Sequence, residues 1–130
     1  MSEPLLLDTH AFVWWVTGDE RRLGPALDRI SGADDVVVSD VVLYQIVVKA
    51  ATNHPIVVTD DVHAWFVEAM SNTDFTALAI TARHIGAVQR LPLHHRDPFD
   101  RMLIAQATAE GRTLVSRDSA FGDYDVAVVW

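Results

Sequence analysis

Three aspartates stand where a folded chain commonly does chemistry on bound ions. Asp8 ends an apolar run at residues 4–8, Asp118 closely follows a second run at residues 113–116, and Asp100 lies in the first turn of an expected helix. Ligand sites of open parallel sheets form beyond the carboxyl ends of the strands. Neighbouring carboxylates repel one another, and Mg²⁺ or Mn²⁺ commonly stabilises them. The sequence therefore predicts a divalent-metal site that could orient water and stabilise charge at a phosphate.

Each aspartate also has a simpler structural explanation. Asp8 can cap the helix that follows it, Asp118 can cap a short turn, and Asp100 can complement a helix dipole. Asp97 precedes a proline and is sufficient as an N-cap, so a direct metal role is its weaker interpretation. The metal hypothesis therefore depends on the acids acting as a set.

Basic side chains accompany these acids. Arg96, Arg101 and Arg117 could contact phosphates, because the planar guanidinium matches phosphate geometry, and a solvated surface is the open alternative. His94 and His95 are adjacent, so their side chains face apart in extended structure and chelate one ion poorly. We expect them in a loop near the substrate rather than in a zinc site.

Alternating apolar runs and helical spacings predict the elements that position these residues. Strands are expected at residues 4–8, 36–38, 75–80, 113–116 and 126–129. Helices are expected at residues 9–16, 23–30, 40–52, 61–70, 81–90 and from 98 to a stop at Gly111. Strands separated by helices favour one α/β domain over residues 1–130, with a central parallel sheet between helix layers.

Composition narrows the classes of function. Without cysteine, any metal must be held by oxygen or imidazole, and a reducing compartment is favoured. We expect a cytoplasmic protein, because the start of the chain lacks a basic leader and no apolar run reaches the length of a membrane span. The formal charge of −8 argues against a general nucleic-acid binder unless a metal reverses the local field, and it favours a basic partner.

Several stretches resemble the PIN-domain family and, more narrowly, VapC-type toxins. They are LLLDTHA at residues 5–11, YQIVVK at residues 44–49, HHRDPFDRMLIAQA at residues 94–107, TLVSRD at residues 113–118 and the ending VVW. The resemblance covers nearly the whole chain in order. It implies a parallel sheet in a three-layer α/β/α sandwich, Mg²⁺- or Mn²⁺-dependent endoribonuclease activity, a homodimer and inhibition by a small antitoxin.

The resemblance also implies a set of site residues. Asp8, Asp100 and Asp118 match the family's metal-binding acids. A fourth catalytic position falls on Gln45, where the family pattern calls for glutamate. Glutamine keeps a carbonyl acceptor but supplies neither an anionic ligand nor a base, so metal affinity and turnover should fall. The change fits either an engineered inactivation or a natural weakening, and we favour the former.

Further residues could contact RNA or orient the metal ligands. Lys49 is the only lysine of the sequence and lies four residues after Gln45, on the same helix face. Asp97, Ser116 and Arg117 adjoin the matched acids and are assigned the same possible role, as are Arg96 and Arg101.

Other functions were weighed against the nuclease. A phosphoacceptor receiver domain needs a lysine late in the chain, and a haloacid-dehalogenase-like phosphatase needs an acid where His10 stands, so both fit poorly. The stronger alternative is a catalytically inactive module that binds an antitoxin or RNA. Most aromatic residues are expected in the core, and a minority could contact a partner; this aromatic group comprises Phe12, Trp14, Trp15, Trp65 and Phe66. An antitoxin segment with arginines and apolar anchors would complement the acidic chain.

Overall fold

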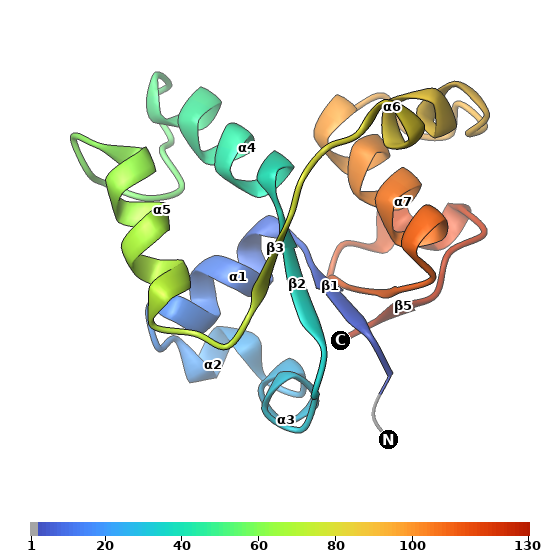
Figure 1. Ribbon diagram of the computed structural model, residues 1–130. Helices are drawn as coiled ribbons and strands as arrows, with labels where there is room; N and C mark the ends of the chain where they lie inside the picture. The colour runs from blue at the N-terminus through green and yellow to red at the C-terminus, as the bar shows by residue number, and fades with distance from the viewer. Residues whose placement is uncertain (1–2) are drawn as a thin grey trace.

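The computed structural model describes residues 3–130, and a parallel sheet forms the centre of this region (Figure 1). Its strands are β1 (Leu5–Leu7), β2 (Val36–Ser39), β3 (Thr76–Leu78), β4 (Thr113–Val115) and β5 (Val128–Val129). They are ordered β3-β2-β1-β4-β5, and every adjacent pair is parallel. β1 is therefore central and pairs with one strand from each half of the chain.

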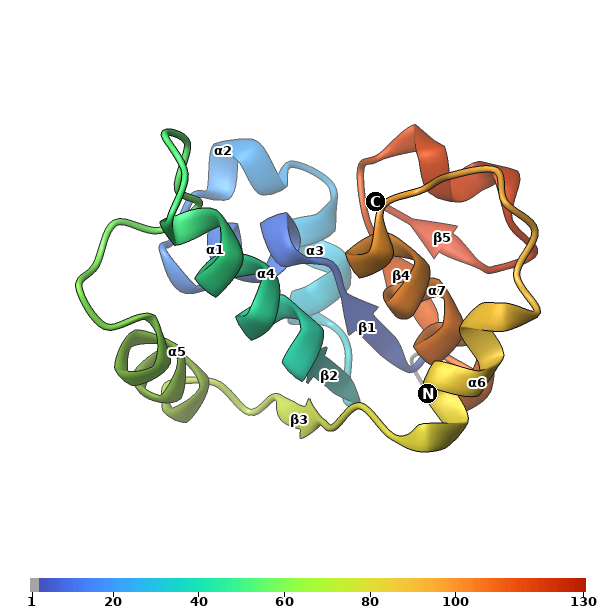
Figure 2. The same ribbon diagram turned by 90° about the horizontal axis from the view of Figure 1, so that it is seen from above.

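Helices cover both faces of the sheet. They are α1 (Thr9–Val16), α2 (Glu20–Leu23), α3 (Ala26–Ser31), α4 (Asp40–Ala50), α5 (Val62–Ser71), α6 (Ala82–Gln89) and α7 (Pro98–Glu110), with the 3₁₀ helix η1 (Ser119–Asp123). α1, α2, α3 and α5 lie on one side, whereas α6 and α7 lie on the other (Figure 2). The predicted three-layer α/β/α sandwich is confirmed.

Alternation within β1 explains the two layers. Leu5 and Leu7 face the cluster that contains Phe12, whereas Leu6 faces the cluster that contains Leu103. All three leucines of β1 are completely buried, as expected for a central parallel strand covered by helices on both faces. Because β1 is buried on both faces, its position is fixed, and so is that of Asp8, the residue that follows it.

The predicted helix at residues 23–30 is wrong as a single element. α2 ends at Leu23, and α3 begins after the Gly24-Pro25 pair. Gly24 has φ 53°, a left-handed conformation that suits glycine and ends a helix, and proline then suits the start of the next one. The predicted strand at residues 126–129 is shortened to its last part, β5.

The aromatic group lies largely in the core, as predicted. Phe12, Trp14 and Phe66 are buried, while Trp15 and Trp65 are partly buried against the same cluster. Within residues 3–130, no helix combines the length and the apolar character needed to cross a membrane.

Candidate functional site

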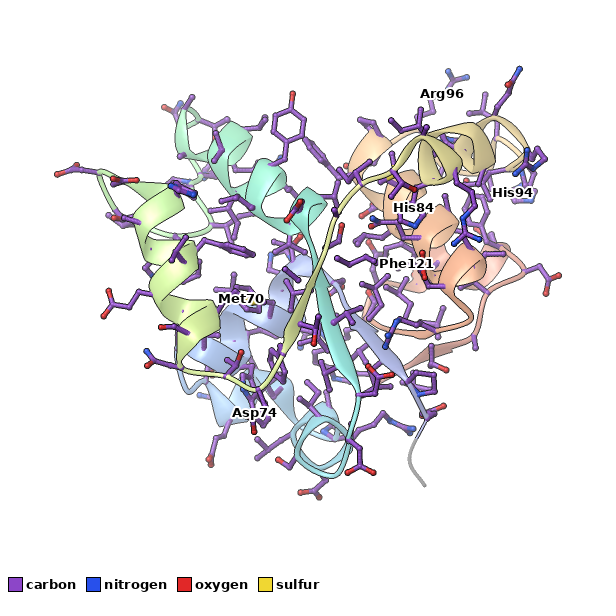
Figure 3. All side chains as sticks on the ribbon, viewed as in Figure 1. Met70, Asp74, His84, His94, Arg96 and Phe121 are labelled. Carbon is purple, nitrogen blue, oxygen red and sulfur yellow. The ribbon has the colours of Figure 1, made fainter. Side chains whose placement is uncertain are left out.

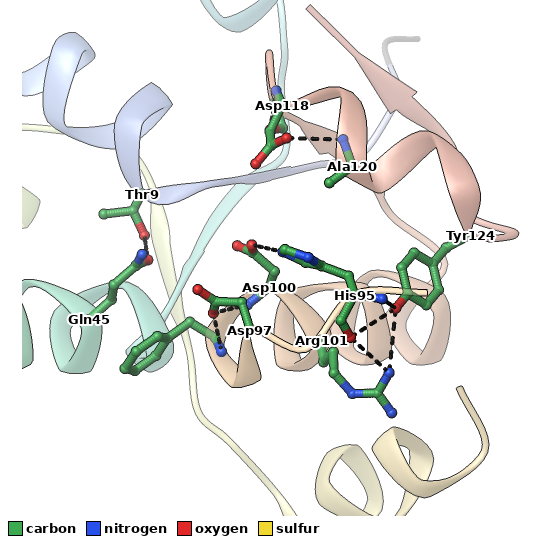
Figure 4. A network of polar contacts seen from close by, with 11 residues as sticks. Thr9, Gln45, His95, Asp97, Asp100, Arg101, Asp118, Ala120 and Tyr124 are labelled. Atoms are coloured by element: carbon green, nitrogen blue, oxygen red, sulfur yellow. Dashed lines mark hydrogen bonds and ion pairs between the residues drawn. The ribbon is translucent and has the colours of Figure 1, made fainter. Parts of the chain in front are cut away.

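The predicted acids lie around one pocket at the carboxyl ends of β1 and β4. The pocket has a volume of about 340 Å³. Its lining residues are Asp8, Thr9, His10, Gln45, Lys49, His54, Ile56, Asp97, Asp100, Leu103, Asp118 and Phe121. Asp8 follows β1, and the first turn of α7 supplies Asp100 from the opposite layer. We call this the acidic pocket, and Figure 4 shows part of its polar network.

Asp8 is the most buried of these acids, with 9% of its surface exposed. Its Oδ1 accepts a hydrogen bond of 2.8 Å from the backbone N–H of Ala11, so Asp8 does cap α1 as its structural explanation requires. Burial raises the pKa of the Asp8 carboxyl, and the nearby Asp118 carboxylate raises it further, while the hydrogen bond with Ser116 opposes these effects. Asp8 is therefore a cap whose negative charge is poorly solvated.

Ser116 connects two of the acids. Its buried side chain hydrogen-bonds with Asp8, and its Oγ accepts a hydrogen bond of 3.1 Å from the backbone N–H of Asp118. Asp118 itself caps η1 through a 2.9 Å bond from Ala120 N to Oδ1. Ser116 thus contacts both Asp8 and Asp118 and can orient them.

Asp97 and Asp100 occupy the start of α7. Asp97 Oδ1 accepts hydrogen bonds from the N–H groups of Phe99 (2.8 Å) and Asp100 (3.2 Å), which confirms its predicted N-cap role. The Asp100 carboxylate is left free of capping and points into the acidic pocket, where its Oδ2 lies 2.7 Å from His95 Nε2. Burial raises the pKa of Asp100, repulsion from Asp97 and Asp118 adds to the effect, and the hydrogen bond with His95 opposes it.

The contact between His95 and Asp100 is a feature that the sequence did not reveal. The hydrogen bond to Asp100 raises the pKa of the His95 imidazole, which favours its charged form beside the acids. The expectation that His94 and His95 lie in a loop is confirmed. Only His95 turns toward the acids, whereas His94 points outward and packs its ring against Tyr124, with centroids 5.3 Å apart (Figure 3).

Arg101 has a structural role that the phosphate hypothesis did not foresee. Its guanidinium donates to the carbonyl oxygens of Pro92 (2.9 Å) and Val88 (3.1 Å), and it does not line the acidic pocket. It also donates to Tyr124 Oη at 3.4 Å, and that hydroxyl accepts a 2.8 Å hydrogen bond from the backbone N–H of His95. Because Pro92 and His95 belong to the loop before α7 and Val88 belongs to α6, Arg101 and Tyr124 connect that loop to the helices on either side of it.

The remaining predicted residues divide between the pocket and the surface. Gln45 and Lys49 both line the acidic pocket, which confirms that they share a face of α4. The Thr9 hydroxyl donates a hydrogen bond to Gln45 Oε1, a contact that sequence reasoning missed. Arg117 adjoins Asp8 and Asp118 in a neighbouring pocket, whereas Arg96 is exposed and points away from the fold (Figure 3).

The donors of the acidic pocket suit a hard divalent cation. Most are oxygen atoms of four carboxylates, one side-chain amide and the Thr9 hydroxyl, the type of ligand that Mg²⁺ and Mn²⁺ prefer, and the imidazoles of His10 and His54 are the remaining potential ligands. Across the described residues, no three histidine, aspartate or glutamate side chains form a ready-made metal site. The predicted acids therefore share one pocket without forming a closed set of ligands, because each is also engaged by a helix cap or by His95.

Comparisons with known proteins agree with this architecture. The structure of VapBC2 from Rickettsia felis bound to a promoter DNA fragment is similar with a TM-score of 0.70 and 13% identity, covering 96% of both chains. A toxin-antitoxin complex from Klebsiella pneumoniae has a TM-score of 0.67 and 18% identity, covering 97% of this chain and 96% of that one. DNA-bound VapBC from Salmonella typhimurium has a TM-score of 0.66 and 13% identity, covering 99% of this chain and 98% of that one.

These structures share the fold at low sequence identity. A search of curated proteins finds no match to the sequence. The sequence model of the PIN domain matches residues 5–127, which is nearly the full length and includes every aspartate of the acidic pocket. The chain therefore belongs to the PIN domain family.

Proposed function

We propose that this chain is the toxin of a type II toxin-antitoxin pair, a VapC-type endoribonuclease that cleaves RNA phosphodiester bonds with Mg²⁺ or Mn²⁺. One observation carries the proposal: Asp8, Asp100 and Asp118 line a single pocket at the carboxyl edge of the sheet in a PIN domain. Burial raises the pKa values of Asp8 and Asp100, and repulsion from Asp118 adds to both effects, as expected of clustered carboxylates that a cation would stabilise.

Asp8, Asp100 and Asp118 would hold the ion, which would supply positive charge to activate water and to stabilise the phosphate as it is attacked. The chain's own residues orient these ligands. Ser116 connects the side chain of Asp8 with the backbone N–H of Asp118, and His95 contacts one oxygen of Asp100. Lys49 supplies positive charge at the rim of the pocket, where an RNA phosphate would approach.

Gln45 weakens this proposed activity. It stands in the acidic pocket where the family pattern has glutamate, and its carbonyl oxygen already accepts the Thr9 hydroxyl. A neutral amide adds less attraction for a divalent cation than a carboxylate does. The same observation supports the second candidate, a catalytically inactive PIN module that binds an antitoxin or RNA.

We also propose a small antitoxin as the partner in the cytoplasm, and a homodimer as the assembly. The fold neighbours from Klebsiella pneumoniae and Salmonella typhimurium are toxin-antitoxin complexes, which supports the antitoxin. The net charge of −8 favours a partner segment with basic residues beside its apolar anchors.

Cleavage of total RNA tests the activity. The chain, its Gln45→Glu form and an Asp100→Asn form of the latter are incubated with Mn²⁺, with EDTA as the control. Gln89→Glu is the matched variant, because it adds the same charge at an exposed position outside the pocket. We expect cleavage that depends on Mn²⁺ and that increases by roughly tenfold or more in Gln45→Glu. Gln89→Glu should leave the cleavage rate unchanged, and Asp100→Asn should abolish cleavage. Absence of cleavage by every form would support the binding module instead.

A further inference from the structure

A second, smaller pocket of about 200 Å³ adjoins the acidic pocket. Its lining residues are Asp8, His10, Trp14, Arg117, Asp118 and Trp130. Asp8, His10 and Asp118 line both pockets, so the two spaces are contiguous. A group bound in the smaller pocket therefore lies next to the acids that we propose to act on RNA.

Flat side chains form the wall of this smaller pocket. The His10 and Trp14 rings have centroids 5.4 Å apart, and the Trp14 and Trp130 rings have centroids 5.9 Å apart at 78°. These rings come from α1 and from the residue that follows β5, so the sheet order brings the two ends of the chain together here. Aromatic rings arranged around a small space are suited to stacking with unpaired nucleobases.

Arg117 completes the wall with positive charge. Its guanidinium carbon lies 4.7 Å from the centroid of Trp14 and 5.8 Å from that of Trp130. No carboxylate in the described part of the chain forms a salt bridge with this exposed arginine, although Asp8 and Asp118 line the same pocket. A guanidinium that lies over aromatic rings without a salt bridge can donate its N–H groups to an incoming phosphate.

We propose that this pocket binds one nucleotide of single-stranded RNA beside the phosphate to be cut. Its base packs among the rings of His10, Trp14 and Trp130, and Arg117 donates to its phosphate. Arg117 brings N–H donors to the pocket, which a phosphate can accept and an arginine from a protein partner cannot, so the pocket favours a nucleotide. The inference rests on the proposed function and adds a place where the substrate is recognised.

Binding without cleavage tests this proposal. The full chain is titrated into a short 5′-fluorescein-labelled single-stranded RNA of mixed sequence in EDTA, and fluorescence anisotropy gives the dissociation constant. We expect Trp130→Ala to weaken binding by roughly tenfold, as measured for the loss of one stacking ring elsewhere, and Trp130→Phe to restore most of it. Arg117→Ala should weaken binding by several-fold and is exposed, so it tests the pocket without disturbing the core.

Arg90→Ala is the matched control, because Arg90 is exposed and lines neither pocket. Binding that is equally tight in Trp130→Ala and Arg117→Ala, with circular dichroism unchanged, would overturn the proposal. So would binding only of an arginine-rich peptide, with no affinity for RNA. Because the binding test is done in EDTA, its result does not depend on cleavage. RNA binding that depends on Trp130, together with no cleavage in the Mn²⁺ experiment, would support this pocket and contradict the proposed nuclease activity.

Discussion

His95 Nε2 lies 2.7 Å from Asp100 Oδ2, so the loop before α7 places an imidazole directly on an acid of the pocket. The backbone of that histidine is fixed independently, since its N–H donates to Tyr124 Oη at 2.8 Å. The contact therefore joins a rigid loop to the first turn of α7. It also makes the charge of the pocket depend on the protonation of one imidazole.

This contact predicts a specific dependence of stability on pH. The hydrogen bond with Asp100 raises the pKa of His95 in the folded state above its unfolded value of about 6.5. The contact should therefore stabilise the fold fully below the unfolded pKa, and this contribution should be lost as pH rises through the folded-state pKa. Thermal unfolding of the chain and of His95→Gln in EDTA, across that range, measures the difference. A difference in unfolding temperature between the unmodified chain and His95→Gln that grows with rising pH would contradict a stabilising contact between charged His95 and Asp100.

Asp8→Asn should stabilise the chain when no divalent ion is present. Asparagine retains an acceptor for the cap of α1 but removes a buried negative charge whose pKa is raised chiefly by burial. The penalty for that charge is present above the folded-state pKa and disappears as the carboxyl is protonated at lower pH. We expect a higher free energy of unfolding at neutral pH in EDTA, measured by urea unfolding.

The same variant should lose cleavage and metal binding entirely, which separates stability from activity. Asp19→Asn is its control, since Asp19 caps α2 at a more exposed position outside the acidic pocket. A lower free energy of unfolding for Asp8→Asn than for the unmodified chain at neutral pH would refute the prediction.

Gln45→Glu should raise the affinity for Mn²⁺. The substitution adds a carboxylate to a pocket that already holds four aspartates, and a cation relieves the resulting repulsion. We expect isothermal titration calorimetry to give roughly tenfold tighter binding, and the midpoint of unfolding to rise further with Mn²⁺ than in the unmodified chain. Gln89→Glu should change neither quantity. Equal Mn²⁺ affinity in all three proteins would exclude position 45 from the metal site.

Arg101→Ala should destabilise the fold without acting through RNA. The guanidinium donates to backbone carbonyls of α6 and of the loop before α7, so its removal leaves several acceptors without their charged donor. We expect a loss of about 2 kcal/mol in the free energy of unfolding. Arg101→Lys should not restore the lost stability, because a single ammonium group cannot replace the several N–H donors of the planar guanidinium. Unchanged stability with weakened RNA binding would support the phosphate role instead.

Local signals account for what the sequence predicted well. α7 begins after Asp97 and ends before Gly111 because an N-cap, a proline and a left-handed glycine act within a few residues of each boundary. Apolar runs immediately before Asp8 and close before Asp118 likewise predict that both lie near strand ends. The division of the expected 23–30 helix also has a local cause, Gly24-Pro25, but the apolar spacing continues across this pair and predicts a single helix.

Features that depend on the path of irregular segments were beyond the sequence. The contacts of His95 and Arg101 arise in the loop before α7, where neither periodicity nor a cap fixes the backbone. The pairing of Arg117 with Trp14 depends on β1 and β4 being neighbours, which the order of elements along the chain does not specify. The sequence thus predicts the acids and Ser116 but not the contacts that His95 and Arg101 make.

The parallel pairing of β1 with β4 also bears on when the acidic pocket can exist. Leu5 is paired with Thr113, and Asp118 follows only after β4, so a ribosome must complete most of the chain before the acids can meet. Pairings between distant segments form late, after the long intervening loop has been closed. A nascent polypeptide of this sequence therefore carries Asp8 through nearly all of its synthesis before the acidic pocket can assemble.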